Sequence, residues 1–527
     1  MIQDSLHGII EGYHDFPVFR FQHYELHGHV TGSTTSSITA DAVVIGSKIH
    51  RKCVLIRLVD LTLESLKDII SSVPLGLIII IPSNTSSMTN EQLNEWQLVD
   101  EFMVEMEMTF PIYFVHESSE LNQIYAHLQS SVSSVETSAL ELLIKSIFDN
   151  GYQIGVSTSY PKQLSEFVLT NIEGSLTGYG LEDQLPTIVF VAHYDALGVA
   201  PSLSFGTDSN ASGVVALLHL AKIFSKLYST PRSAAKHNLL FLLSAAGKFN
   251  YQGSKRFLEE NMDVHDDTIL KNAAFVICLD SIGNKGLHLH VSKPPAEDSP
   301  LHSFLKKLEY FAKELNVAFS MVHKKINLAQ EQLAWEHERY SFRKVPASTL
   351  SSYDNVAASQ RRSLFDQQNR FDVNHLTTNI QIISKSMMSL LYNIEPSLIA
   401  ESELEMENWG RTQVKSLHSY ISEHPRSAQM LRHDGQVVLS LVNLMQNTLK
   451  NVNKHTFKLE RKDPEVIFYD TFSVTAYAYR VKPAVFDLFL AMIVGSYIFG
   501  VYLFISYFPN LYYTLHLNLL RNKPKFA

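Results

Sequence analysis

The stretch of residues 187–213, TIVFVAHYDALGVAPSLSFGTDSNASG, constrains the fold of this chain more than any other. It reads as a buried strand, a loop that carries His193 and Asp195, and a Gly- and Ser-rich turn that opens a helix. Parallel α/β sheets bind their ligands at the carboxyl ends of the strands. His and Asp are also common zinc ligands. The stretch therefore predicts an α/β sheet with a metal-binding type of loop at its carboxyl edge.

Further apolar runs predict the rest of this sheet. Strands are expected at residues 187–191, 238–243, 274–279 and 287–291, and the clearest helix between them at residues 213–227. Nearly continuous apolar strands separated by helices indicate a mainly parallel sheet that is covered on both faces. We therefore expect a three-layer α/β/α domain over residues 138–396.

Other regions flank this domain. Short apolar runs at residues 53–59, 75–81 and 112–115, with a helical pattern at 90–108, predict a small N-terminal α/β lobe over residues 1–137. A Ser-rich segment, residues 130–138, marks the boundary. Residues 397–487 are more polar and mostly helical in pattern, which predicts a helical stalk.

The C-terminal region contains a membrane signal. Residues 488–508, LFLAMIVGSYIFGVYLFISYF, are uncharged and long enough to cross a bilayer. A buried core helix is the alternative, but it would not be apolar all round over this length. We expect one transmembrane helix and a short basic tail over residues 509–527; the nearly balanced flanking charges do not settle its orientation. The first residues lack the pattern of a signal peptide. Either targeting relies on the C-terminal span or the chain begins downstream of its natural start, and we favour the second.

Charge and cysteine content argue against other classes of protein. The formal net charge of −9 and a pI near 6.2 give no basic surface, which disfavours a nucleic-acid partner. Cys53 and Cys278 each lie inside an apolar run and read as small buried hydrophobes rather than as a disulfide or a nucleophile.

Several longer motifs carry a family resemblance. The segments GKFNYQG (247–253), LHLHVSKPP (287–295), AWEHER (334–339) and YRVKPAVFDL (479–488) resemble the nicalin family. That family is a nicastrin-related, catalytically degenerate branch of the di-zinc aminopeptidase and glutamate-carboxypeptidase superfamily. The superfamily motifs cover only the middle domain, whereas the nicalin resemblance runs through nearly the whole chain.

The resemblance implies a ligand set that this chain only partly retains. His193 matches a zinc ligand, Asp195 matches the residue that orients it, and Asp280 in LDSIG matches the fourth ligand. Counting back from Gly213 puts Ser209, not Asp208, at the position of the bridging carboxylate. A pair of zinc ions about 3.5 to 4 Å apart needs such anionic ligands.

Two further positions are lost in a second motif. Aligning on Gly253 and Ser254 puts Gly247 at the position of the general base and Lys248 at that of a second ligand. Glycine cannot take a proton from water, and an ammonium repels a dication. Lys248 could instead offset the retained acids in place of the metal. The last ligand, a His, has no match in residues 351–372.

Other candidate residues have simpler interpretations. His337 and Glu338 begin an HExxH pattern, but Ser341 replaces the second His. His288 and His290 share one face of a strand, where packing is the favoured interpretation. Sequons at Asn84 and Asn210 are candidate N-glycosylation sites.

We therefore expect no catalytic residue and no bound cofactor, with a single residual ion at His193, Asp280 and Asp208 left open. The resemblance implies a single-pass endoplasmic reticulum membrane scaffold with a lumenal pseudoenzyme domain. Its implied partners are the Nodal modulator protein, a small multi-spanning membrane protein and translocon components that assist multi-pass membrane proteins, with an influence on Nodal signalling. One alternative is a membrane-anchored zinc aminopeptidase or carboxypeptidase with a rearranged ligand set, and another is a receptor for a peptide N-terminus.

Overall fold

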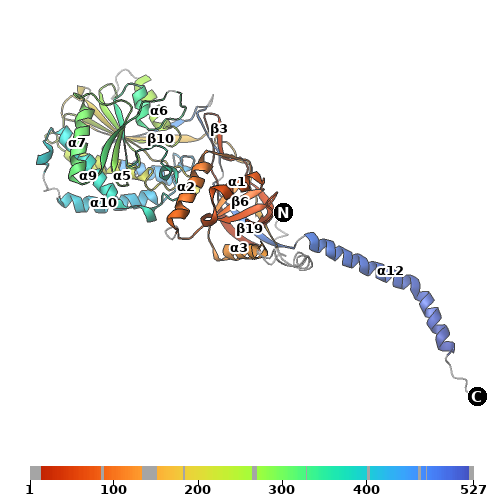
Figure 1. Cartoon of the computed structure of the whole chain (residues 1–527). Coiled ribbons are helices and arrows are strands. Elements are labelled where there is room, and N and C mark those ends of the chain that lie inside the picture. Colours follow the sequence, from red (N-terminus) through yellow and green to blue (C-terminus); the bar gives the residue numbers. More distant parts are fainter. Residues whose placement is uncertain are drawn as a thin grey trace, which may run out of the picture.

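The structure, a computed structural model, describes residues 13–84, 88–132, 151–181, 184–263, 270–327, 329–399, 404–460, 464–470, 472–482 and 484–521. Two α/β domains lie side by side, and one long helix, α12 (Ala484–Arg521), extends away from the smaller domain (Figure 1). The predicted α/β class is confirmed.

An eight-stranded sheet forms the larger domain, in the order β15-β14-β16-β13-β11-β12-β10-β17. Its four central strands are parallel to one another: β16 (Ala347–Ser351), β13 (Ala273–Leu279), β11 (Thr187–His193) and β12 (Asn238–Ser244). The outer strands are β15 (Phe319–His323), β14 (Leu287–Val291), β10 (Val168–Leu176) and β17 (Asn451–Lys458). Both β14 and β10 run antiparallel to their central neighbours.

Helices cover both faces of this sheet because successive side chains of each strand point to opposite sides. In β11, Ile188 and Phe190 pack towards the layer of α5 (Ala211–Leu227), α7 (Pro300–Glu314) and α9 (Val373–Leu391). Val189 and Val191 pack on the other face, with α6 (Gln252–Leu258) and α8 (His337–Phe342). The expected three layers are therefore present, and the uninterrupted apolar strands are explained by burial on both sides.

The smaller domain is a closed barrel in the order β1-β19-β9-β4-β5-β6-β8. The predicted apolar runs form β5 (Cys53–Arg57), β6 (Gly76–Ile81) and β8 (Ile112–His116). Around the barrel lie α1 (Leu63–Ser71), α2 (Asn90–Glu105) and α3 (Ser119–Val132). The remaining barrel strands are β1 (Tyr13–Arg20), β4 (Ile38–Val43), β9 (Gly151–Val156) and β19 (Ser473–Val481).

The predicted stalk over residues 397–487 is wrong. Two helices do form, α10 (Leu404–Ser422) against α5 and α9, and α11 (Gln436–Gln446) against the edge of the large sheet. The rest of the segment supplies strands: β17 extends the large sheet and β19 enters the barrel. A short strand, β18 (Val466–Phe468), joins a small sheet with β2 (His23–Leu26), β3 (His29–Ser33) and β7 (Glu107–Met108).

The composition of this segment explains the error. As an edge strand, β17 exposes most of its side chains and buries Phe457, so it reads as polar. In β19, Ala476 and Ala478 are buried at a period of two, which is a strand pattern with small side chains. The predicted boundaries at residues 137 and 138 lie outside the described residues, and β9 shows that residues 151–156 belong to the barrel.

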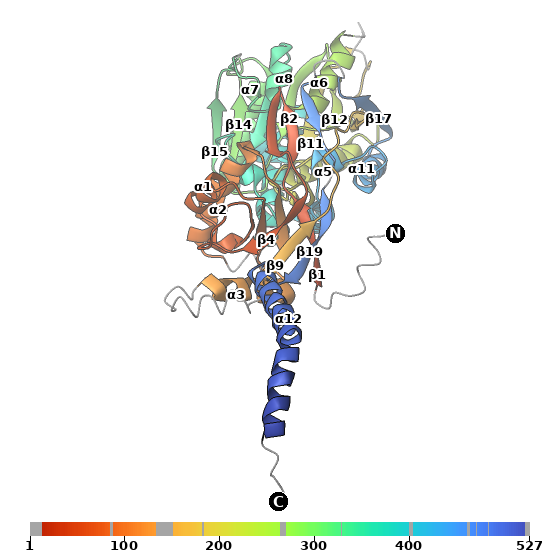
Figure 2. The same cartoon turned by 90° about the vertical axis from the view of Figure 1, so that its right-hand side faces the viewer.

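The C-terminal helix is long and apolar enough to cross a membrane over Phe486–Asn518, and this part is not buried against either domain. Figure 2 shows it running away from the barrel side of the molecule. The predicted tail over residues 509–527 begins too early, because the helix continues through Pro509 to Arg521. Proline inside a helix bends it, and a bend is visible in Figure 1.

Candidate functional site

The predicted site residues meet at the carboxyl edge of the large sheet. His193 ends β11, Asp280 follows β13, and Lys248 lies in the loop after β12. Asp208 lies in the turn before α5. His193, Asp195 and Asp280 are each 0% exposed, so this is an interior site rather than an open cleft.

His193 contacts a carboxylate that was not among the predicted site residues. Its Nδ1 lies 3.4 Å from Oε2 of Glu336, the residue just before α8. The other oxygen of Glu336 accepts hydrogen bonds from Ser244 (2.6 Å) and Ser254 (2.7 Å). Nε2 of His193 has no hydrogen-bond partner in the described part of the chain. The signal for Glu336 was its place beside His337 in AWEHER, but its contact with His193 spans 143 residues of sequence.

Asp195 does not orient His193 through its carboxylate. Its two oxygens instead accept the backbone N–H groups of Gly247 (2.6 Å) and Lys248 (3.0 Å), and so hold the loop after β12. A Cβ on Gly247 would lie 2.3 Å from both Cβ and Cγ of His193. The position of the lost general base therefore has no room for a side chain.

Asp280 is paired with cations. Nη2 of Arg361 donates a hydrogen bond to Oδ2, Ser281 donates to Oδ1 at 2.8 Å, and Nζ of Lys248 lies 4.0 Å from Oδ1. Burial alone would raise the pKa of Asp280, but the charges of Arg361 and then Lys248 hold this pKa far below its usual range. Arg361 was not predicted as a site residue, although it lies in the segment that lacks the expected His ligand.

Lys248 lies between Ser209 and Asp280. Its ammonium donates to Oγ of Ser209 at 2.5 Å, so the lost bridge and the lost ligand now contact each other. Burial lowers the pKa of Lys248 to about 8, against the opposing charge of Asp280. The guanidinium of Arg361 also stacks over Trp335, 4.3 Å from the ring centroid. The two cations therefore supply positive charge beside Asp280 with side-chain atoms.

Asp208 has a different set of partners. It accepts hydrogen bonds from the backbone N–H of Gly283 (2.8 Å), from Asn284 (2.7 Å) and from the hydroxyl of Tyr353 (3.1 Å). Its own backbone N–H donates to Asp366 at 2.7 Å. Burial raises the pKa of Asp208, and burial followed by the charge of Asp208 raises the pKa of Asp366 to about 7.

These residues do not fit a pair of zinc ions. Within the described ranges, no group of three or more His, Cys, Asp or Glu side chains could hold a metal. Both oxygens of Asp195 and of Asp280 are already engaged by N–H, hydroxyl or cationic groups. A dication beside Asp280 would have to displace Lys248 and Arg361, because it would be repelled by both.

Asn210 has a structural role that argues against a glycan. It is 0% exposed, and its Nδ2 donates to the carbonyls of His193 (3.0 Å) and Leu279 (2.8 Å). Its Oδ1 accepts from the N–H of Gly213 at the start of α5. A sugar on this nitrogen would break these bonds, so the prediction for Asn210 does not fit the folded chain. Asn84 is exposed and stays a prediction.

The remaining candidate histidines have protein partners. His337 is hydrogen bonded to Thr349 (2.8 Å) and His288 to Ser320 (2.7 Å). His290 bonds the carbonyl of Tyr353 at 2.8 Å and stacks on Trp335. The three side chains bond to neighbouring strands and loops, and they form no common chelating group.

The chain is similar to several known proteins. The sequence pattern of Peptidase family M28 matches residues 171–360. The BOS complex subunit NCLN of Rattus norvegicus is 40% identical, over 97% of this chain and 92% of that protein. Nicalin of Caenorhabditis elegans is 27% identical, over 94% of this chain and 91% of that protein. The crystal structure of the γ-secretase component Nicastrin is 12% identical with a TM-score of 0.60, covering 88% of this chain and 99% of that one, and shows a shared fold.

Proposed function

This chain belongs to the nicalin family, whose members include the BOS complex subunits NCLN, and on that premise we propose that it is a non-catalytic scaffold subunit of the BOS complex. The observation that carries the non-catalytic part is the contact of Lys248 with Ser209 beside Asp280. It puts an ammonium at one, and a neutral hydroxyl at the other, of two positions where hydrolysis would need metal-binding carboxylates.

The finer proposal concerns place and partners. The apolar span of α12 supports a single-pass anchor, and we infer an endoplasmic reticulum membrane with both α/β domains on the lumenal side. The proposed partners are the Nodal modulator protein, a small multi-spanning membrane protein and translocon components that act on multi-pass membrane proteins. An influence on Nodal signalling would follow from that complex.

Affinity purification of the full tagged chain from mild detergent tests the scaffold proposal. We expect a stoichiometric set of membrane proteins to be recovered with it and identified by mass spectrometry. The matched control is the same chain with residues 486–518 replaced by an unrelated transmembrane helix, which separates partners held by the membrane span from partners held by the folded domains. Recovery of the chain alone would count against the proposal.

A metal and activity measurement tests the competing peptidase. The purified chain is expected to contain no stoichiometric zinc and to leave aminoacyl and γ-glutamyl substrates intact. Chelator-sensitive hydrolysis that is abolished by His193→Ala would replace the scaffold proposal with a metallopeptidase that uses a rearranged ligand set.

Glycosylation tests the orientation. Asn84 is exposed on the smaller domain, whereas Asn210 is fully buried. We expect Asn84→Gln to remove an endoglycosidase-sensitive mobility shift and Asn210→Gln to leave it in place. A chain that carries no glycan at Asn84 and is digested by protease added outside sealed microsomes would reverse the proposed orientation.

A further inference from the structure

A small cavity lies next to the vestigial site. Its volume is about 40 Å³, and its charged lining residues are Lys248, Arg361 and Arg362, with no acidic residue among the described ones that line it. A single water needs about 10 to 15 Å³ by the same measure. The cavity therefore has room for a group of about three heavy atoms, which is the size of a carboxylate.

Two of the cations around the cavity, Arg361 and Arg362, have N–H groups or charge that no described side chain pairs with. Nε of Arg361 is buried and has no hydrogen-bond acceptor among the described residues. Asp280 is the one acid within ion-pair distance of any of the three cations in the described ranges, and it already serves both Arg361 and Lys248. Arg362, at the rim, forms no ion pair with a described residue.

We propose that this cavity binds a carboxylate of a peptide or protein partner. Arg recognises a carboxylate through two parallel N–H groups, and such charge-assisted hydrogen bonds are stronger when water is excluded. The ammonium of a peptide N-terminus, which an aminopeptidase-like pocket would otherwise be expected to receive, would be repelled by the three cations. The chain has therefore reversed the charge preference of the pocket.

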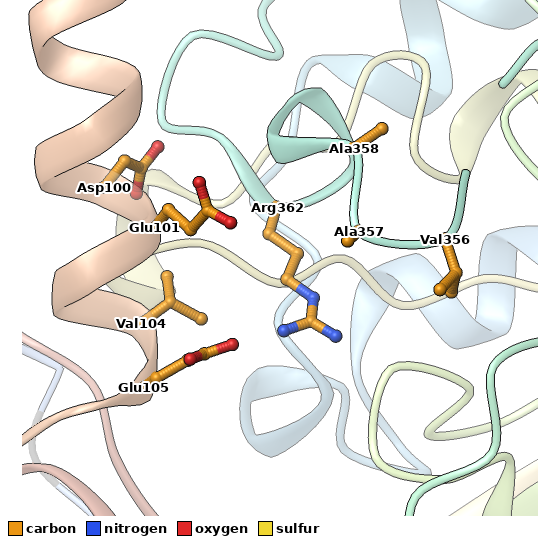
Figure 3. Close-up of a pocket in the computed structure, with 8 residues that line it drawn as sticks. All are labelled: Asp100, Glu101, Val104, Glu105, Val356, Ala357, Ala358 and Arg362. Carbon is orange, nitrogen blue, oxygen red and sulfur yellow. The ribbon is translucent and has the colours of Figure 1, made fainter. Parts of the chain in front are cut away.

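Arg362 also borders a second cavity, whose lining includes acidic side chains. Figure 3 shows Arg362 facing the carboxylates of Glu101 and Glu105, which project from α2 across a cavity of about 120 Å³. Val356 lines both cavities. Neither acid forms an ion pair with Arg362, but their negative charges oppose an incoming carboxylate. Removing Glu105 should therefore tighten binding, whereas removing the charge of Arg362 should weaken it.

Calorimetric titration of the full chain in detergent tests this proposal. The probes are a short N-acetylated peptide with neutral side chains and a free C-terminal carboxylate, the same peptide amidated, and the amidated peptide with one internal Glu. We expect the amidated peptide without Glu not to bind, and preference between the other two to identify a chain end or a side chain as the source. Arg362→Gln should weaken binding by about tenfold, and Glu105→Gln should strengthen it by about threefold.

The control is Arg256→Gln, which removes the same charge from an exposed Arg that pairs with Glu259 and Glu260. It should leave binding unchanged, and all variants should melt at the temperature of the parent chain. Absence of binding to the parent chain, equal binding of the plain amidated peptide, or equal weakening by Arg256→Gln and Arg362→Gln would each overturn the proposal. The titration is independent of complex formation, so the scaffold proposal can fail while this one stands.

Discussion

Two buried aspartates in the vestigial site, Asp280 and Asp208, face different surroundings. Asp280 lies against the cations Arg361 and Lys248. Asp208 receives hydrogen bonds from the neutral donors of Gly283, Asn284 and Tyr353, and lies near the second acid Asp366. Both aspartates are almost fully buried, so the difference lies in the partners and not in exposure.

The comparison shows two ways to keep an acidic site folded with side chains alone. A fixed cation lets the carboxylate stay ionised, and the pKa of Asp280 is accordingly held far below its usual range. Neutral donors do not fully offset burial, and the pKa of Asp208 is raised. One half of the site is therefore stabilised by ion pairing, and the other half favours proton uptake.

The largest expected effect comes from removing the fixed cation. Arg361→Met should destabilise the chain by about 3 to 5 kcal/mol, because it leaves Asp280 buried with only the more distant Lys248. Thermal and denaturant unfolding of the purified chain would measure the loss. The matched control is Arg362→Met, which changes an adjacent Arg without an ion pair to a described residue and should cost under about 1 kcal/mol. Equal losses in the two variants would show that Asp280 does not depend on Arg361.

A steric test addresses the contact between the loop after β12 and His193 at the end of β11. Gly247→Ala should cost about 1 to 3 kcal/mol, because the new methyl group would lie 2.3 Å from the buried ring and Cβ of His193. The control is Gly151→Ala in β9, where the nearest atom would be 3.8 Å away. Unfolding midpoints of the two variants would be compared. An unaffected Gly247→Ala would mean that the loop can move aside, and that a general base could be accommodated there.

The sequence predicted the parts of this site that depend on local patterns. Apolar runs identified β11 and β13, and the carboxyl ends of these strands placed His193 and Asp280 at the same edge of the sheet. Arg361 and Glu336 were missed because they reach the site from 81 and 143 residues away in sequence, and no local periodicity encodes such contacts. The sequon at Asn210 gave no sign that the same side chain caps a helix.

The same limit applies to the fold. The barrel strands β5, β6 and β8 were predicted because each is a continuous apolar run. The barrel also contains the paired strands β9 and β19, which come from distant parts of the chain. The fully buried side chains of β19 are the small ones of Ala476 and Ala478. Pairing between distant segments is decided by the whole core rather than by a local pattern.

A pH measurement tests the hydrogen-bonded half of the site. The pKa of Asp366 is raised to about 7, above the value near 4 expected in the unfolded chain. Between about pH 4 and pH 7 the folded chain therefore holds a proton that the unfolded chain has released. The resulting stabilisation is complete below about pH 4 and is lost as the pH rises to about 7. Asp366→Asn should remove most of this pH dependence, which a difference of about three pKa units puts at roughly 4 kcal/mol, measured as unfolding free energy at several pH values. Asp434→Asn, an exposed control, should leave the slope between these pH values intact.

The smallest expected effect comes from Lys248, and it separates the two cations that serve Asp280. Burial lowers the pKa of Lys248 to about 8, which means that its charge is poorly accommodated even beside Asp280. Replacement of a buried ion by an apolar side chain of similar volume is often neutral, provided that the partner keeps another cation. Lys248→Met should therefore change the unfolding free energy by less than about 1 kcal/mol. Arg361 still binds Asp280 in this variant, and Ser209 still donates a hydrogen bond to the carbonyl of Arg361 at 2.7 Å. A loss as large as that of Arg361→Met would mean that the two cations act as one unit, and the double variant would then cost little more than either single change.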